Sequence, residues 1–127
     1  MTAKPEGPAR TLLLVDDDDD LAAAFTRALG RHGYVVHRAR TGTEAIAVAA
    51  GAGSLDAAVV DLVLPGVGGI EVVQQLRRLH PACRIISLTG LDAPEVTGAF
   101  LAAGADRFFC KPVDLGVLLA ALAEGPS

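Results

Sequence analysis

The chain has 127 residues, the length of one ordinary domain, and 51% of them are hydrophobic, so it can bury a substantial core. A net charge of −4 and an aromatic content of 4% argue against a nucleic-acid-binding surface, which needs clustered lysines and arginines with stacking rings. The apolar run 12–15 is too short for a signal peptide or a membrane span, so we expect a cytoplasmic protein that contacts neither membranes nor, directly, nucleic acid.

Strand-like and helix-like segments alternate along most of the chain. Residues 1–9, which include two prolines, are expected to be a flexible leader, residues 10–124 one domain and residues 125–127 a tail. The expected strands are 11–16, 34–39, 57–64, 84–89 and 107–111. The expected helices, rich in alanine and leucine, are 20–33, 42–53, 69–80, 93–104 and 114–125.

The strand segments are almost continuous runs of apolar residues, which indicates burial on both faces and therefore a parallel sheet covered by helices. The sequence predicts an α/β fold with a doubly wound, five-stranded parallel sheet and five helices, a flavodoxin-like three-layer α/β/α arrangement. In such sheets the functional groups collect outside the carboxyl ends of the strands.

Polar residues lie near the carboxyl ends of four of these strands. The first strand ends in Asp16 and Asp17, Asp61 lies in the third, Thr89 ends the fourth and Lys111 ends the fifth. All five are expected to meet at one edge of the sheet. Three carboxylates in one place repel one another, whereas Mg²⁺ prefers several oxygen ligands, so the pattern predicts a magnesium site.

Asp16 and Asp17 open a run of five aspartates, 16–20. We expect Asp18–Asp20 to lie in solvent and to start the following helix, because aspartate accepts hydrogen bonds from unpaired amides at a helix N-terminus. A calcium loop of the EF-hand type needs glycine and glutamate where this chain has Leu21 and Arg27, so that alternative is excluded.

Four motifs, "LLLVDDD", "DLVLPGVGG", "SLTG" and "GADRFFCKP", occur in this order at the expected strand ends. Together they resemble the receiver domain of two-component response regulators over residues 11–122. The resemblance implies that Asp61 accepts a phosphoryl group from a phosphohistidine of a sensor kinase or a phosphotransfer protein. It further implies that Thr89 and Lys111 contact the phosphoryl group, and that Asp16, Asp17, Asp61 and the backbone carbonyl of Val63 hold Mg²⁺.

The same resemblance implies a switch and a control of phosphate lifetime. Thr89 and Phe108, which stands where tyrosine is frequent, are the implied switch pair. Their movement changes the face made by the fourth helix, the fifth strand and the fifth helix, which binds a downstream protein or a second copy of the chain. Val63 and Leu91 flank the phosphoryl group; both are apolar, so slow loss of phosphate is expected.

Two other functions are compatible with parts of this pattern. A phosphatase of the haloacid dehalogenase type also uses aspartate and Mg²⁺, but it needs a late acidic pair, and only Asp114 and Glu124 follow the lysine. A pseudo-receiver that acts as a scaffold is disfavoured because every reactive group is present. We expect a signalling domain that is no enzyme beyond assisting its own phosphorylation, with output by contact because the chain leaves no room for a helix-turn-helix.

The two cysteines, Cys83 and Cys110, have no spacing that suggests a metal site, and we expect both to be small buried residues. The three histidines are scattered among turn and surface signals, and none is expected to be catalytic.

Overall fold

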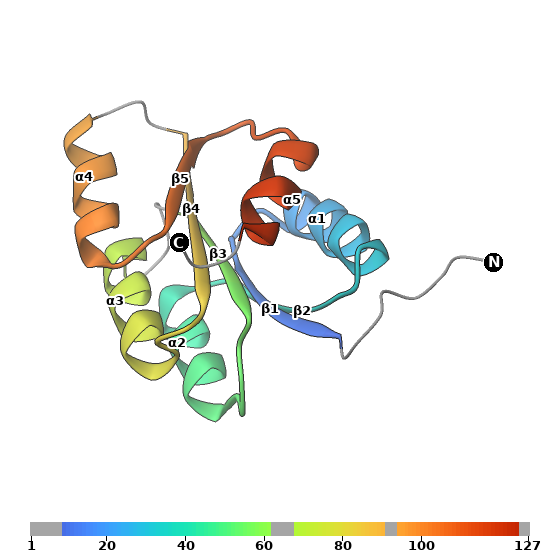
Figure 1. Cartoon of the computed structure of the whole chain (residues 1–127), viewed down its shortest axis with the longest axis horizontal. Helices are drawn as coiled ribbons and strands as arrows, with labels where there is room; N and C mark the ends of the chain where they lie inside the picture. Colours follow the sequence, from blue (N-terminus) through green and yellow to red (C-terminus); the bar gives the residue numbers. More distant parts are fainter. Residues whose placement is uncertain (1–8, 62–67, 91–93, 125–127) are drawn as a thin grey trace.

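The structure, a computed structural model, describes residues 9–61, 68–90 and 94–124, with the backbone alone for residues 94–97 (Figure 1). In these residues strands and helices alternate. The elements are β1 (Arg10–Val15), α1 (Asp19–Arg31), β2 (Tyr34–Ala39), α2 (Gly42–Gly51), β3 (Ala57–Asp61), α3 (Gly69–Leu79), β4 (Arg84–Thr89), α4 (Pro94–Ala103), β5 (Arg107–Cys110) and α5 (Leu115–Ala123).

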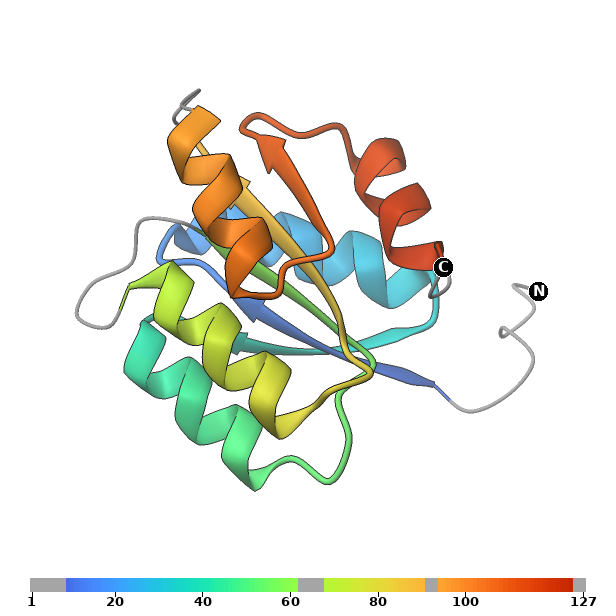
Figure 2. The same cartoon turned by 60° about the vertical axis from the view of Figure 1, so that its left-hand side comes forward.

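The strands form one parallel sheet in the order β2-β1-β3-β4-β5, so the predicted doubly wound fold is confirmed. Helices α1 and α5 cover one face and α2, α3 and α4 cover the other, as Figures 1 and 2 show from two directions. The register places Val15 beside Val60, Asp61 beside Leu88, and Thr89 beside Cys110. The carboxyl ends of the four strands that carry the predicted site therefore lie at one edge.

Two apolar layers, one on each face of the sheet, explain the continuous hydrophobic strands. Along β1, Leu12 and Leu14 pack with α1 and α5, whereas Leu13 and Val15 pack with the residues beneath α2, α3 and α4. Each of these four side chains is at most 1% exposed. Burial of alternate residues on opposite faces stabilises both layers at once, by about 1.5–3 kcal/mol for each large aliphatic side chain.

The prediction that both cysteines are buried is half wrong. Cys83 is buried, and this burial raises the pKa of its thiol to about 12. Cys110 is exposed, because it is the last residue of the edge strand β5, where side chains are only partly covered. Neither residue forms a disulfide.

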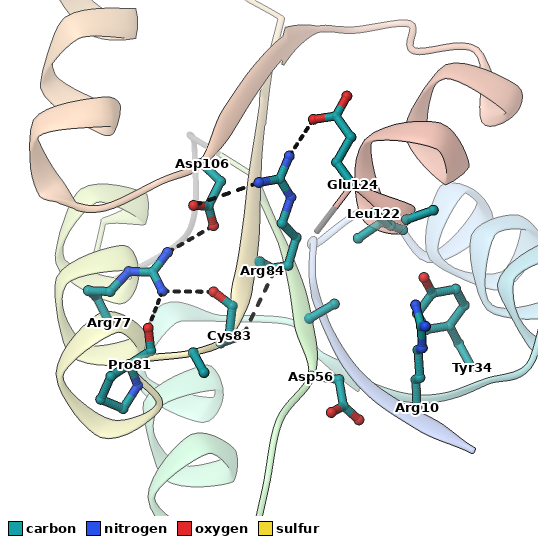
Figure 3. A pocket seen from close by; sticks show the side chains of 13 residues that line it. Arg10, Tyr34, Asp56, Arg77, Pro81, Cys83, Arg84, Asp106, Leu122 and Glu124 are labelled. Atoms are coloured by element: carbon teal, nitrogen blue, oxygen red, sulfur yellow. Dashed lines mark hydrogen bonds and ion pairs between the residues drawn. The ribbon is translucent and has the colours of Figure 1, made fainter. Parts of the chain in front are cut away.

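A network of ion pairs ties together the amino ends of the strands, opposite the predicted site. Arg77 of α3 donates to the carbonyls of Cys83 (2.7 Å) and Gly104 (2.7 Å), and it pairs with Asp106 at 2.9 Å. Figure 3 shows Asp106 between Arg77 and Arg84 at the edge of a hollow of about 460 Å³. Because both arginines share the carboxylate of Asp106, the network joins α3, β4 and the start of β5.

Arg84 extends the network to the end of α5. Its guanidinium lies 2.6 Å from the carboxylate of Glu124 and donates to the carbonyl of Ala121 at 3.1 Å. Arg107 pairs with the same glutamate at 2.7 Å.

In the part of the chain that the structure describes, no helix has the length and apolar character needed to cross a membrane.

We expect Arg77→Ala to lower the free energy of unfolding by about 2–3 kcal/mol, because the partly buried carbonyls of Cys83 and Gly104 lose this donor and Asp106 loses one of its partners. Arg78→Ala on the same helix is the matched control, since the side-chain hydrogen bond of Arg78 goes to Gln75 in the exposed part of the helix. That control should change stability by less than about 0.5 kcal/mol. Urea unfolding measures both, and equal effects would contradict the structural role of the network.

Candidate functional site

Buried polar residues gather at the carboxyl ends of the central strands. Asp16 follows β1 and is 1% exposed, Asp61 ends β3 at 7%, and Thr89 ends β4 with no exposed area. Burial of charged groups is costly unless they are paired or bind a metal. The position and burial of these side chains therefore indicate a site rather than a solvated surface.

Lys111 joins two of the carboxylates. Its Nζ lies 3.0 Å from Oδ2 of Asp16 and 2.8 Å from Oδ2 of Asp61. Its backbone amide donates to the carbonyl of Thr89 at 2.6 Å, so the lysine passes the end of β4 on its way from β5. One ammonium thus neutralises part of the repulsion between two buried carboxylates.

The pKa of Lys111 reflects this position. Burial alone lowers the pKa of an ammonium group, but the hydrogen bonds to Asp61 and Asp16 and their negative charges outweigh burial, so the pKa of Lys111 is raised above its ordinary value. The lysine is therefore charged throughout the neutral range.

The three predicted carboxylate ligands can hold one cation together. Oxygens of Asp16, Asp17 and Asp61 all lie within 4.8 Å of one another. Asp17 is exposed while the other two are buried, so the group opens toward solvent on one side. Hard oxygen ligands in this number, with room for water, suit Mg²⁺ or Ca²⁺.

The rest of the aspartate run starts helix α1, as predicted. Asp18 is the N-cap residue, and its Oδ1 accepts from the amide of Leu21 at 3.1 Å. The amide of Asp18 in turn donates to Oδ1 of Asp16 at 2.9 Å. Asp19 is exposed but also forms two ion pairs: its carboxylate lies 2.9 Å from Arg38 and 2.8 Å from Arg40. The sequence did not predict these contacts.

The predicted site residues fall into three groups. The structure brings five of them to one edge of the sheet: Asp16, Asp17, Asp61, Thr89 and Lys111. Phe108 lies in β5, three residues before Lys111, and is half-buried, with its ring 5.7 Å from that of Phe100. Val63 and Leu91 lie outside the residues that the structure describes.

Arg38 is a site residue that the sequence analysis missed. It donates from Nε and Nη2 to the backbone carbonyl of Asp16, at 3.0 and 2.9 Å. The signal available in the sequence was an arginine near the end of the predicted strand 34–39, and only the strand order, which places β2 beside β1, connects it to the aspartates.

An apolar hollow of about 280 Å³ opens beside the lysine. It lies between α1 and the segment that follows β5. Its lining residues are Leu21, Phe25, Leu88, Lys111, Pro112 and Val113.

Comparison with known families agrees with this geometry. The family model of the response regulator receiver domain matches residues 12–123. The chain belongs to this family. Receiver domains are signalling domains that sensor kinases phosphorylate, and they bind a divalent metal at their acidic cluster.

Individual relatives agree with the family match. The photosynthetic apparatus regulatory protein RegA of Cereibacter sphaeroides is 39% identical over 122 residues, which are 95% of this chain and 66% of that protein. A response regulator of Burkholderia pseudomallei, solved with a phosphorylated aspartic acid, a calcium ion and citrate, is 32% identical with a TM-score of 0.84, covering 89% of this chain and 66% of that one. A CheY-like receiver domain of Methanospirillum hungatei is 31% identical with a TM-score of 0.84, over 88% and 89% of the two chains.

The receiver domain described here spans only part of the length of its curated relatives. This chain covers 28%, 66% and 44% of the full length of three curated relatives. The family match therefore establishes the domain and its general role in signalling.

We expect Lys111→Met to lower the free energy of unfolding by about 2 kcal/mol near neutral pH, because Asp16 and Asp61 lose a shared, partly buried cation. Since the pKa of Lys111 is raised by folding, its stabilising contribution is complete below the ordinary value of 10.5 and is lost as the pH rises through the higher folded value.

The difference in stability between wild type and Lys111→Met should thus be constant from about pH 8 to about pH 10 and should shrink at higher pH. Urea unfolding of both proteins at each pH measures this difference. A difference that already shrinks between about pH 8 and pH 9 would show that the lysine pKa is not raised.

Proposed function

We propose that this receiver domain accepts a phosphoryl group on Asp61 from a phosphohistidine of a histidine kinase or a histidine phosphotransfer protein. The observation that carries the proposal is the placement of Asp61 at the end of β3, where Lys111 Nζ lies 2.8 Å from its carboxylate and Asp16 and Asp17 complete an acidic group. A nucleophilic carboxylate, a fixed cation and metal ligands are the groups that phosphoryl transfer to aspartate needs.

The donor set fits a magnesium ion. Asp16, Asp17 and Asp61 would hold it, together with the backbone carbonyl of Val63, which lies outside the described residues. When bound, Mg²⁺ supplies positive charge that offsets the repulsion between the acceptor carboxylate and the incoming phosphoryl group. The related structure from Burkholderia pseudomallei, which holds calcium and a phosphorylated aspartate, supports a divalent ion in this role.

The protein side of the reaction follows from the positions of the side chains. An oxygen of Asp61 forms a bond to phosphorus while the phosphorus–nitrogen bond of the phosphohistidine breaks and its electron pair returns to the imidazole. Lys111 keeps its proton and stabilises negative charge on the phosphoryl oxygens, because its pKa is raised. The hydroxyl of Thr89, at the end of the neighbouring strand, donates to one of those oxygens.

The phosphoryl donor is a protein, and the surface beside the acceptor suits one. The apolar hollow between α1 and the segment after β5 begins at Lys111, so a partner side chain can be buried next to the acceptor.

We propose a cytoplasmic location, where such kinases present their phosphohistidine. The domain boundaries at residues 10 and 124 and the flanking 1–9 and 125–127 remain part of this proposal.

The output of the domain is proposed to use the face formed by α4, β5 and α5, through a downstream protein or a second copy of the chain. Phosphorylation draws Thr89 toward the phosphoryl group and moves Phe108 toward the interior. Two observations support this: Phe108 already contacts Phe100, and its neighbour across the strand pair is Ser87, a small and fully buried residue.

Phosphate loss is proposed to be slow. Val63 and Leu91, the two apolar residues expected to flank the phosphoryl group, cannot orient an attacking water through a hydrogen bond. Both lie outside the described residues, so this part of the proposal is supported by the sequence alone.

We expect Asp61→Asn to abolish labelling by a phosphorylated kinase or by acetyl phosphate, because an amide keeps the shape of the side chain and lacks its nucleophilic oxygen. Asp20→Asn is the matched control, since Asp20 lies exposed in the first turn of α1, and it should label as the wild type does. Mass spectrometry identifies the labelled residue. Phosphate found on a different residue, or full labelling of Asp61→Asn, would disprove the proposal.

The switch predicts a signal far from the acceptor. Beryllofluoride with Mg²⁺ mimics the phosphorylated aspartate, and its addition should shift the NMR signals of Phe108 together with those of Asp61. In Thr89→Ala the signals near Asp61 should still shift while those of Phe108 remain in place, because the hydroxyl that couples them is gone. Shifts confined to the neighbourhood of Asp61 in the wild type would reject this switch.

A further inference from the structure

The turn that carries Asp16 and Asp17 is held by an arginine of the edge strand β2. Arg38 donates from Nε at 3.0 Å and from Nη2 at 2.9 Å to the backbone carbonyl of Asp16, and its Nη1 lies 2.9 Å from Oδ1 of Asp19. We propose that Arg38 is a positioning residue for the metal site, which closes the Asp16–Asp19 turn and thereby directs Asp17 toward the cation. This inference rests on the function proposed above.

The guanidinium acts where strand pairing stops. Strands β1 and β2 end at Val15 and Ala39, and the amide of Asp16 still donates to the carbonyl of Ala39 at 3.1 Å. The carbonyl oxygen of Asp16 accepts hydrogen bonds from Arg38 instead of from a strand amide. Since the two carboxylate oxygens of Asp16 accept from Lys111 and from the Asp18 amide, every polar group of this residue is fixed.

The arginine is itself confined. Its side chain is 24% exposed and lies on the same strand face as Tyr34 and Val36, which pack in the layer formed with α1. Its far end is held by Asp19 in the first turn of that helix.

The two possible roles of Arg38, as a mere charge or as a positioning residue, predict opposite effects of its removal on the affinity for a cation. Arg38 places a positive charge beside the acidic group, so by Coulomb's law alone its removal should tighten the binding of a cation. Partners that orient metal ligands act in the other direction, since their loss typically weakens metal binding by 10- to 100-fold. The sign of the change in affinity therefore distinguishes a positioning residue from a mere charge.

The test is a Mg²⁺ titration without any phosphoryl donor, followed by the amide NMR signals of residues 16–18. We expect Arg38→Ala to weaken Mg²⁺ binding by about tenfold. Arg40→Ala is the matched control, because it removes the same charge and a partner of the same Asp19 but no contact to Asp16. It should leave the affinity unchanged or slightly higher. If Arg38→Ala binds Mg²⁺ as tightly as the wild type, or more tightly, the proposal is overturned.

Two further substitutions, made singly and together, keep the test decisive if Arg38→Ala does not fold. Arg38→Lys keeps the charge but lacks the planar fork that reaches both Asp16 and Asp19, so we expect a loss of about threefold. Asp19→Asn should give a smaller loss, and the double variant with Arg38→Lys should not add the two, because both act through one contact. Wild-type affinity in Arg38→Lys, or strictly additive losses, would overturn the proposal.

This outcome is separable from that of the proposed function. A wild type that binds Mg²⁺ but is not labelled on Asp61 would disprove the phosphoacceptor role and leave the Mg²⁺ comparison of Arg38 and Arg40 valid. A wild type that is labelled on Asp61, with Arg38→Ala unaltered in Mg²⁺ affinity, would overturn the positioning role alone.

Discussion

The mutual repulsion of carboxylates at one end of the sheet is the constraint on which the arrangement of this receiver domain depends. Asp16 and Asp61 come from adjacent strands and are almost fully buried, so they need a cation close by. Lys111 provides one from β5, reaching past the end of β4. Because one ammonium serves two carboxylates and Asp17 brings a third, negative charge remains for a metal to neutralise.

The charged groups are arranged differently at the two ends of the sheet. At the amino ends, Arg77, Arg84 and Arg107 share the carboxylates of Asp106 and Glu124, and this network joins elements that are distant in the sequence. At the carboxyl ends one ammonium faces three carboxylates, an arrangement that suits the proposed binding of a cation. The arginine network therefore ties the strands together at the end opposite the proposed site.

Much of the fold was predictable because its signals are local and repeated. Continuous apolar strands and alanine-rich helices indicated the parallel sheet, and the topology then placed Asp16, Asp61, Thr89 and Lys111 at one edge. The bounds were less certain. The predicted helix 42–53 ends at Gly51 in the structure, and residues 62–64 of the predicted third strand lie outside the described residues.

What the sequence could not show depends on which elements become neighbours. The exposure of Cys110 follows from the position of β5 at the edge of the sheet. The contacts of Arg38 with Asp16 and Asp19 require β2 to lie next to β1, and the two arginines that bind Asp19 gave no motif of their own. Long-range polar contacts of this kind have no period in the sequence, so they appear only once the strands are in order.

The separation of Lys111 from its partners along the chain has a consequence for biosynthesis. Asp16 and Lys111 are 95 residues apart, and Lys111 directly follows β5, the last strand. A ribosome makes the central strands β1, β3 and β4 before it makes the cation that neutralises their ends. The nascent sheet therefore carries its acidic edge uncompensated, unless a free metal ion binds there, until the final βα unit emerges and completes the domain.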